Sequence, residues 1–219
     1  MKPLVGCLRR LRARISSRCA VTGVGKASAA ARTALELVSF RPRITVFLGC
    51  AGAYPHSNLV VGDIVVATHE ILGDEGVETS STFLDLERLG LPSVKEGRMR
   101  WFDEIPVARP TRVTMGILGA RWVGTCAVRT GRLVTVSTSS GTAERALALS
   151  RRTGGVAENM EGAGAAIAAL MAGHRLFEVR GISNLTGRRD RRAWDIPTAC
   201  ERAAEAAVHL ALHELGISP

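Results

Sequence analysis

Short apolar runs alternate with amphipathic or alanine-rich stretches along the whole of this 219-residue chain. This alternation is typical of an α/β domain, in which strands and helices follow one another in turn. The apolar runs predict strands at residues 18–24, 44–50, 63–71, 112–118, 133–137, 155–158 and 175–182. The stretches between them predict helices at residues 26–39, 142–151, 160–171 and 197–215. Residues 73–110 have no strong period, so we expect loops and short elements near a site there.

The apolar fraction and the cysteines limit the class of protein. Apolar residues make up 46% of the chain, enough for one substantial core, so we expect a single domain over residues 1–219 with an atypical, basic segment at residues 1–17. No apolar run reaches the roughly 20 residues of a membrane span, which excludes a transmembrane protein. The five cysteines are scattered and lack metal-ligand spacing, so we expect no disulfide framework, no bound metal and a cytoplasmic location.

The net charge of +9 lies in one segment of the sequence. Residues 1–48 hold ten Lys and Arg side chains against one acid, Glu36, whereas residues 49–219 hold nineteen of each sign. A nucleic-acid binder carries its basic charge on one face of the folded domain. We therefore expect neither nucleic acid nor a membrane as a partner.

Two glycine-rich turns follow predicted strands, at residues 23–26 and 49–54. Such turns let backbone amides approach a ligand closely, at a helix N-terminus that favours anions. Neither turn fits a known phosphate-binding motif. Each is therefore either a tight connection or a ligand loop.

The segment Glu158-Asn159-Met160-Glu161-Gly162 places two carboxylates on either side of a methionine where a strand is expected to meet a helix. Carboxylates at such a junction can accept hydrogen bonds from a vicinal diol, and a thioether can lie against a sugar. Acids are also favoured at helix N-termini by the helix dipole alone. The spacing of these residues alone does not decide between a sugar-binding site and a simple helix start.

Small polar residues follow two of the predicted strands. Ser183 and Asn184 come after the strand at 175–182, and Ser140 and Gly141 lie beyond the strand at 133–137. Ligands of open α/β sheets bind outside the carboxyl ends of strands, although such residues can also simply start a turn. Together with the turn at 49–54, these segments predict a pocket.

Five motifs in order give the chain a resemblance to a known superfamily. They are GCAG at 49–52, VGDIVV at 61–66, SGT at 140–142, ENME at 158–161 and RGISN at 180–184. Their order and spacing resemble the purine nucleoside phosphorylase and methylthioadenosine/S-adenosylhomocysteine nucleosidase superfamily over residues 20–215. The resemblance implies a three-layer α/β/α sandwich with a central mixed sheet.

Longer strings narrow the resemblance. GDEGVET, FLDLERLGLP, STSSGT, ENMEGAG and RGISN with RDRRAWDIP resemble the futalosine hydrolase family. This resemblance implies hydrolysis of the N-glycosidic bond of futalosine to hypoxanthine and dehypoxanthine futalosine, in the alternative menaquinone pathway. It also implies no cofactor and a homodimer or higher homo-oligomer.

The resemblance assigns two catalytic residues. Glu161 is expected to bind the ribose hydroxyls and favour an oxocarbenium-like transition state, and Asn184 to contact the purine. Adenine-specific members carry aspartate in place of Asn184; an amide donates instead to a 6-oxo group and accepts from a protonated N7, which favours hypoxanthine. The expected substrate contacts are Ala51, Gly52, Ser140, Gly141, Asn159, Met160 and Ser183.

The chain departs from the family's pattern where a glutamate that activates water follows the first strand. Residues 4–12 contain no acid, so His56, Asp74 and Glu75 are the loop candidates for the base. Two alternatives stay open: a phosphorylase that holds phosphate with Lys26 or the early arginines, and a weakly active nucleoside-binding relic. For the 5′ benzoate of futalosine, the candidates are Arg188, Arg189, Arg191 and Arg192.

Overall fold

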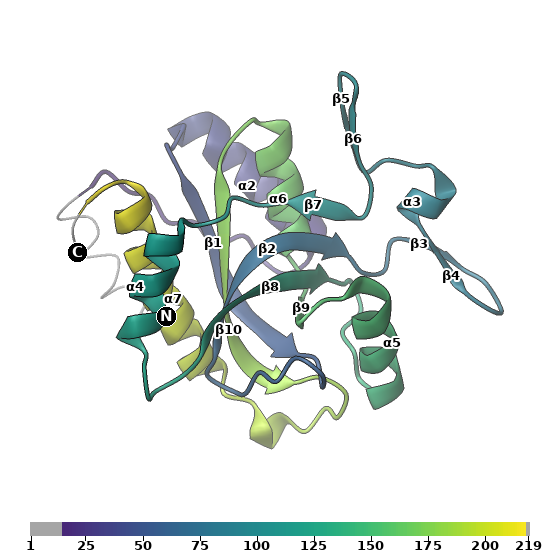
Figure 1. The fold of residues 1–219 in the computed structure, drawn as a ribbon. Coiled ribbons are helices and arrows are strands. Elements are labelled where there is room, and N and C mark those ends of the chain that lie inside the picture. Colours follow the sequence, from purple (N-terminus) through teal and green to yellow (C-terminus); the bar gives the residue numbers. More distant parts are fainter. Residues whose placement is uncertain (1–14, 218–219) are drawn as a thin grey trace.

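A central mixed sheet organises the protein in the computed structural model, which describes residues 15–217. Within that range its strand order is β10-β1-β9-β8-β2-β7 (Figure 1). The strands are β1 (Thr45–Ala53), β2 (Ile64–Leu72), β7 (Glu104–Pro106), β8 (Val128–Thr135), β9 (Ala157–Asn159) and β10 (Leu176–Leu185). The helices are α2 (Lys26–Phe40), α4 (Arg112–Arg121), α5 (Ala143–Thr153), α6 (Gly162–Met171) and α7 (Ile196–Glu214).

The sheet closes on itself through β10. This strand pairs in parallel with β1 and antiparallel with β2, at the opposite side of the strand order. Inside the closed sheet, small and branched apolar side chains from β1, β2, β8, β9 and β10 form one core cluster. Its members are Ala51, Ala53, Leu59, Val65, Ala67, Leu133, Ala157 and Ile182.

Helices cover the sheet in separate groups (Figure 1). Helices α4 and α7 bury one core cluster against β2 and β10, and α2 and α6 bury another against β1 and β10. Helix α5 packs its Ala146 and Leu149 against the end of β8. The expectation of an α/β fold with a central mixed sheet and helices around it is therefore confirmed.

Two of the predicted strands are wrong. Residues 18–24 form no strand, and Val21 is 78% exposed with no sheet partner to bury it. Residues 112–118 lie in helix α4, although β-branched residues such as Val113 and Ile117 favour a strand. Burial there follows the helical period, since Thr114, Leu118 and Trp122 are buried while Val113 is exposed.

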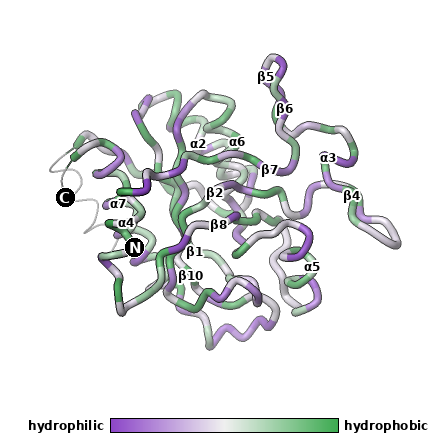
Figure 2. The backbone as a smooth tube through the Cα atoms, viewed as in Figure 1, coloured by the Kyte–Doolittle hydropathy of each residue, from purple (hydrophilic) through white to green (hydrophobic). Residues whose placement is uncertain are grey.

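Residues 73–110 form short elements, as expected: β3 (Gly76–Glu78), β4 (Phe83–Asp85), α3 (Leu86–Leu89), β5 (Val94–Glu96), β6 (Met99–Trp101) and β7. The β3–β4 and β5–β6 hairpins project from the body of the molecule (Figure 1). In contrast, the strands of the central sheet contain many apolar residues, which Figure 2 colours green. No helix within residues 15–217 has the length and apolar character needed to cross a membrane.

Candidate active site

The carboxyl end of β1 lies at the centre of the predicted site. Gly52 pairs with Asn184 of β10 on one side and with Glu158 of β9 on the other. A Cβ at Gly52 would lie 3.0 Å from Asn184 Nδ2 and 2.9 Å from Thr186 Cγ2, so only glycine allows these side chains to approach the strand. The sheet register thus brings three predicted segments together: residues 51–52, 158–161 and 183–184.

Asn159 joins β9 to the start of α6. Its Oδ1 accepts hydrogen bonds from the backbone N–H groups of Glu161 (2.9 Å) and Gly162 (2.7 Å), which satisfies donors that a helix N-terminus leaves free. Its Nδ2 donates to Glu70 Oε1 at 2.8 Å. The buried amide therefore fixes the backbone of Glu161, and its predicted contact with substrate stays a prediction.

The Glu161 carboxylate is held at both oxygens. Oε1 accepts from the backbone N–H of Gly25 at 3.2 Å, and Oε2 lies 3.6 Å from Arg180 Nη1. Its side chain is 19% exposed, so it is partly open to a ligand. Glu158, the other carboxylate of this segment, is buried and accepts from both the N–H (2.7 Å) and the hydroxyl (2.6 Å) of Ser140. Glu161 is thus the carboxylate of the pair that remains open.

Arg180 was not singled out by the sequence analysis. This buried guanidinium donates from Nε to Glu178 Oε1 (2.7 Å), from Nη2 to Asn159 Oδ1 (3.1 Å) and from Nη1 to the carbonyl of Cys50 (3.3 Å). It lies between the carboxylates of Glu178 and Glu161. The sequence feature that could have identified Arg180 is the Glu-x-Arg pair inside an apolar strand, since charges are rarely buried unless they are paired.

Ser183 and Asn184 end strand β10 as predicted. Ser183 Oγ lies 2.8 Å from Asn184 Oδ1 and 3.2 Å from the carbonyl of Ala51. Asn184 Nδ2 donates to the carbonyl of Leu185 at 3.2 Å, and the side chain is only partly buried. The amide is therefore oriented by its neighbours and accessible.

The remaining predicted contacts border the same region. Ser140 docks on Glu158, and its carbonyl accepts from Gly187 N at 3.4 Å, which ties the turn before α5 to the segment after β10. Gly141 is the next residue of that turn. Met160 is half-buried between β9 and α6, next to Glu161.

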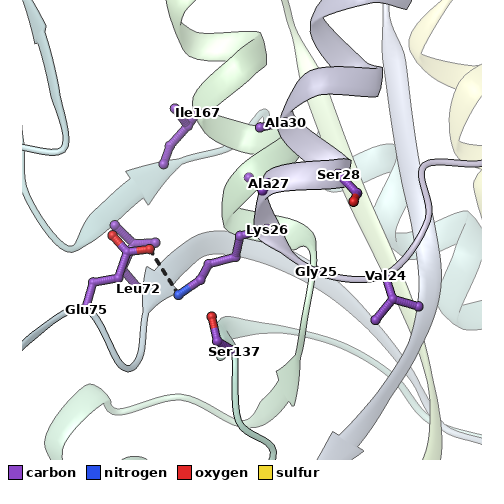
Figure 3. A pocket seen from close by; sticks show the side chains of 11 residues that line it. Val24, Gly25, Lys26, Ala27, Ser28, Ala30, Leu72, Glu75, Ser137 and Ile167 are labelled. Carbon is purple, nitrogen blue, oxygen red and sulfur yellow. Dashed lines mark ion pairs between the residues drawn. The ribbon is translucent and has the colours of Figure 1, made fainter.

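A cavity of about 520 Å³ lies at the N-terminus of α2 (Figure 3). It is lined by Val24, Gly25, Lys26, Ala27, Ser28, Ala30, Leu72, Glu75, Ser137, Gly164 and Ile167. None of the predicted substrate contacts is among these residues, but Gly25 links the cavity to Glu161 through its N–H. The cavity therefore adjoins the Glu161 carboxylate.

Lys26 carries the positive charge in this cavity. Its Nζ lies 2.7 Å from Asp74 Oδ1 and 3.0 Å from Glu75 Oε1; Figure 3 shows the second pair. Burial lowers the pKa of Lys26, but the two carboxylates outweigh it and the pKa lies above its ordinary value. Two acids thus neutralise this cation.

The three candidates for the water-activating base lie in different settings. Burial raises the pKa of Asp74, but Lys26 and the N–H groups of Ser137 and Thr138 outweigh it, so the pKa lies below its ordinary value. His56 lies exposed in the turn after β1. Glu75 is the candidate whose side chain lines the cavity. The acid-free stretch at residues 4–12 lies outside the described residues.

The arginines proposed for the 5′ side follow β10. Arg188, Arg189, Arg191 and Arg192 are exposed, around the short helix η1 (Arg191–Ala193). Figure 2 shows this loop as a hydrophilic segment at the edge of the molecule. Their role stays a prediction.

Comparison with known sequences matches residues 16–215 to the model of the phosphorylase superfamily. A futalosine hydrolase of Acidothermus cellulolyticus is 40% identical over 187 residues, which cover 85% of this chain and 71% of the relative. A futalosine hydrolase of Thermus thermophilus is 35% identical over 197 residues, covering 89% and 81%.

Solved structures share the fold. A methylthioadenosine/S-adenosylhomocysteine nucleosidase of Colwellia psychrerythraea in complex with adenine superimposes with a TM-score of 0.70 at 23% identity, covering 99% of this chain and 91% of the other. A futalosine hydrolase mutant of Helicobacter pylori superimposes with a TM-score of 0.68 at 16% identity, covering 99% and 95%.

Proposed function

Because this chain belongs to the phosphorylase superfamily and, within it, to the futalosine hydrolases, we propose that it hydrolyses the N-glycosidic bond of futalosine and releases hypoxanthine. The observation that carries the proposal is 40% identity to a futalosine hydrolase over 85% of the chain. The protein is an N-glycosyl hydrolase acting on a purine nucleoside.

Glu161 is the residue that we assign to the ribose. Cleavage of an N-glycosidic bond leaves positive charge on the sugar, and hydrogen bonds to the ring hydroxyls strengthen as that charge develops. A carboxylate accepts such bonds from two hydroxyls at once. The contacts of Glu161 with Gly25 N and Arg180 Nη1 hold it in one orientation, so the group is organised before the reaction begins.

Asn184 is the residue that we assign to the leaving base. Its amide both donates and accepts, which suits the 6-oxo group and protonated N7 of hypoxanthine. The contact of Oδ1 with Ser183 Oγ supports a fixed orientation of the amide. Ala51, Gly52, Ser140, Gly141, Met160 and Ser183 are the other proposed contacts, and Asn159 acts through the backbone of Glu161.

For activation of water we propose Glu75. Its carboxylate lines the cavity that adjoins Glu161 and reaches it from the loop after β2. Both carboxylates pair with Lys26, but Asp74 also accepts from the N–H groups of Ser137 and Thr138. General-base catalysis contributes typically about 10²- to 10⁴-fold to the rate.

Hydrolysis is favoured over phosphorolysis by the partners of the basic residues. A phosphate site needs cations that are free to pair with it. Lys26 pairs with two carboxylates, and Arg18 contacts Glu36 and Ser39. Among residues 15–217, neither of these proposed phosphate ligands is available.

The deciding experiment incubates the purified protein with futalosine, inosine or methylthioadenosine in phosphate-free buffer and follows the release of free base by chromatography. We expect hypoxanthine from futalosine and little base from the other two. Turnover that requires phosphate or arsenate would identify a phosphorylase, and tight binding of hypoxanthine without turnover would identify a binding relic.

The cellular setting belongs to the same proposal. We place the enzyme in the alternative menaquinone pathway, in the cytoplasm, as a single nucleosidase domain that forms a homodimer or higher homo-oligomer. Leu35 and Val38, which are 65% and 72% exposed on the outer face of α2, support self-association. Most of α6, in contrast, is buried within the chain. Sedimentation of the purified protein tests the oligomer.

A further inference from the structure

Two glutamates without a role in the proposed reaction are buried on strands of the central sheet. Glu70 of β2 and Glu178 of β10 are both 0% exposed. Burial of an ionised carboxylate is costly unless the group is paired or takes up a proton. The fold nevertheless keeps both carboxyl groups away from solvent.

The two carboxyl groups approach one another at the start of α6. A Cβ at Gly162 would collide with an oxygen of each, so both groups lie against the same glycine. Their remaining partners differ. Glu70 accepts from Thr135 Oγ1 (2.6 Å) and Asn159 Nδ2 (2.8 Å), whereas Glu178 Oε1 accepts from Arg180 Nε (2.7 Å).

One oxygen of the pair is left without a donor. Glu178 Oε2 is buried, and no N–H or O–H among residues 15–217 donates to it. The Glu70 carboxyl group lies beside that of Glu178, since Glu70 Oε1 and Glu178 Oε1 both crowd the position of a Cβ at Gly162. A proton on Glu70 supplies the missing donor, because a protonated carboxyl group gains an O–H while it keeps its capacity to accept.

We propose that Glu70 and Glu178 share one proton and act as a positioning pair for the catalytic centre, holding Asn159, which fixes the backbone of Glu161, and Arg180, which faces its carboxylate. With one proton the pair carries a single negative charge, which Arg180 balances while it still faces Glu161 at 3.6 Å. With no proton the second negative charge draws the guanidinium toward the pair and away from Glu161.

The charges around the pair are consistent with this assignment. Burial, followed by the charge of Glu178, raises the pKa of Glu70 well above its ordinary value, against the lowering by Arg180 and Thr135. Glu161 at the start of α6 and Cys50 of β1 also interact electrostatically with the Arg180 guanidinium. The hydrogen bond with Cys200 lowers the pKa of Cys50.

The test is Glu70→Gln, whose amide supplies permanent N–H donors in place of the shared proton. The role assigned to Arg180 and Glu161 rests on the proposed function. We expect wild-type kcat/KM with futalosine to fall at alkaline pH by about tenfold per pH unit once the proton is lost. We expect Glu70→Gln to lose this decline, so that its kcat/KM stays level between neutral and alkaline pH. Glu201→Gln, exposed on α7, is the matched control and should keep the wild-type profile.

A second measurement needs no substrate and so separates this proposal from the function. A carboxyl group whose pKa is raised by folding makes the folded state less stable as pH rises above the ordinary glutamate range, because the unfolded chain releases the proton first. The melting temperature of Glu70→Gln should therefore fall less with rising pH than that of the wild type. Equal pH dependence of melting in the two proteins would overturn proton sharing. A changed melting profile with an unchanged activity profile would overturn the positioning role, and absence of all turnover would refute the proposed function alone.

Discussion

Glu161 is held by contacts from three directions: the N–H of Gly25, the guanidinium of Arg180 and, through its backbone, the amide of Asn159. Asn159 is a near neighbour in the sequence, whereas Gly25 and Arg180 come from distant parts of the chain. A carboxylate fixed in this way loses little freedom when it binds two sugar hydroxyls. The proposed catalytic strength of Glu161 thus depends on its surroundings as much as on its own charge.

Glu161→Gln should lower kcat for futalosine by about 100- to 1,000-fold, because the amide keeps the shape but lacks the charge that stabilises an oxocarbenium-like transition state. Release of hypoxanthine under saturating substrate measures it. Glu201→Gln serves as the control for surface charge. A rate near that of the wild type would refute the ribose role.

Asn184→Asp should shift preference toward adenine nucleosides, since a protonated carboxyl group can donate to purine N7 and no longer offers an N–H to a 6-oxo group. The ratio of kcat/KM for futalosine to that for methylthioadenosine measures the shift. Leu185→Ala, at the exposed neighbouring position, should leave the ratio unchanged. If the ratio is the same in Asn184→Asp and in the wild type, Asn184 does not select the base.

Glu75→Gln should lower kcat by about 10²- to 10⁴-fold if this carboxylate activates water. Glu78→Gln, exposed on β3 of the same loop region, is the control. A kcat of Glu75→Gln close to that of the wild type would assign the base elsewhere.

Helix α4 forms although several of its residues favour a β-strand. Thr111 begins the helix by accepting from Thr114 N at 3.1 Å, and the side chains that follow at helical spacing bury Leu118 against α7. The β-branched residues of this segment favour a strand by only fractions of a kcal/mol each. Burial of the side chains along one face of the helix outweighs this preference.

Thr111→Ala should therefore destabilise the protein by about 1 kcal/mol, because it removes the hydroxyl that caps α4. Thr111→Ser keeps a hydroxyl and should lie close to the wild type. Urea denaturation of the three proteins compares their free energies of unfolding. Equal stability of Thr111→Ala and wild type would show that the cap contributes nothing.

At the scale of the whole molecule, closure of the sheet sets both the core and the site. Ile182, fully buried inside the closed sheet, lies one residue before Ser183 and beside the pairing of β10 with β1 and β2. Packing at this position therefore supports the strand end that carries Asn184.

Ile182→Ala should cost about 2 to 5 kcal/mol of unfolding free energy, because it leaves a cavity in a closed core that has little room to collapse. Leu185→Ala on the same strand is 52% exposed and should change stability by at most about 0.5 kcal/mol. Denaturant unfolding measures both. A small cost at Ile182 would mean that the closed sheet relaxes around the gap.

The amino-acid sequence by itself determined the α/β class, most of the strands and helices, the family and the segments around Glu161 and Asn184. These follow from hydrophobic period and from local motifs, which depend on neighbours in the chain. Only the tertiary structure decided the helical state of α4, the pairing of Lys26 with Asp74 and Glu75, and the buried cluster of Arg180 with Glu70 and Glu178. Each of these depends on partners brought together by the closure of the sheet, because the burial and pairing of a charge are properties of its surroundings in space rather than of its place in the sequence.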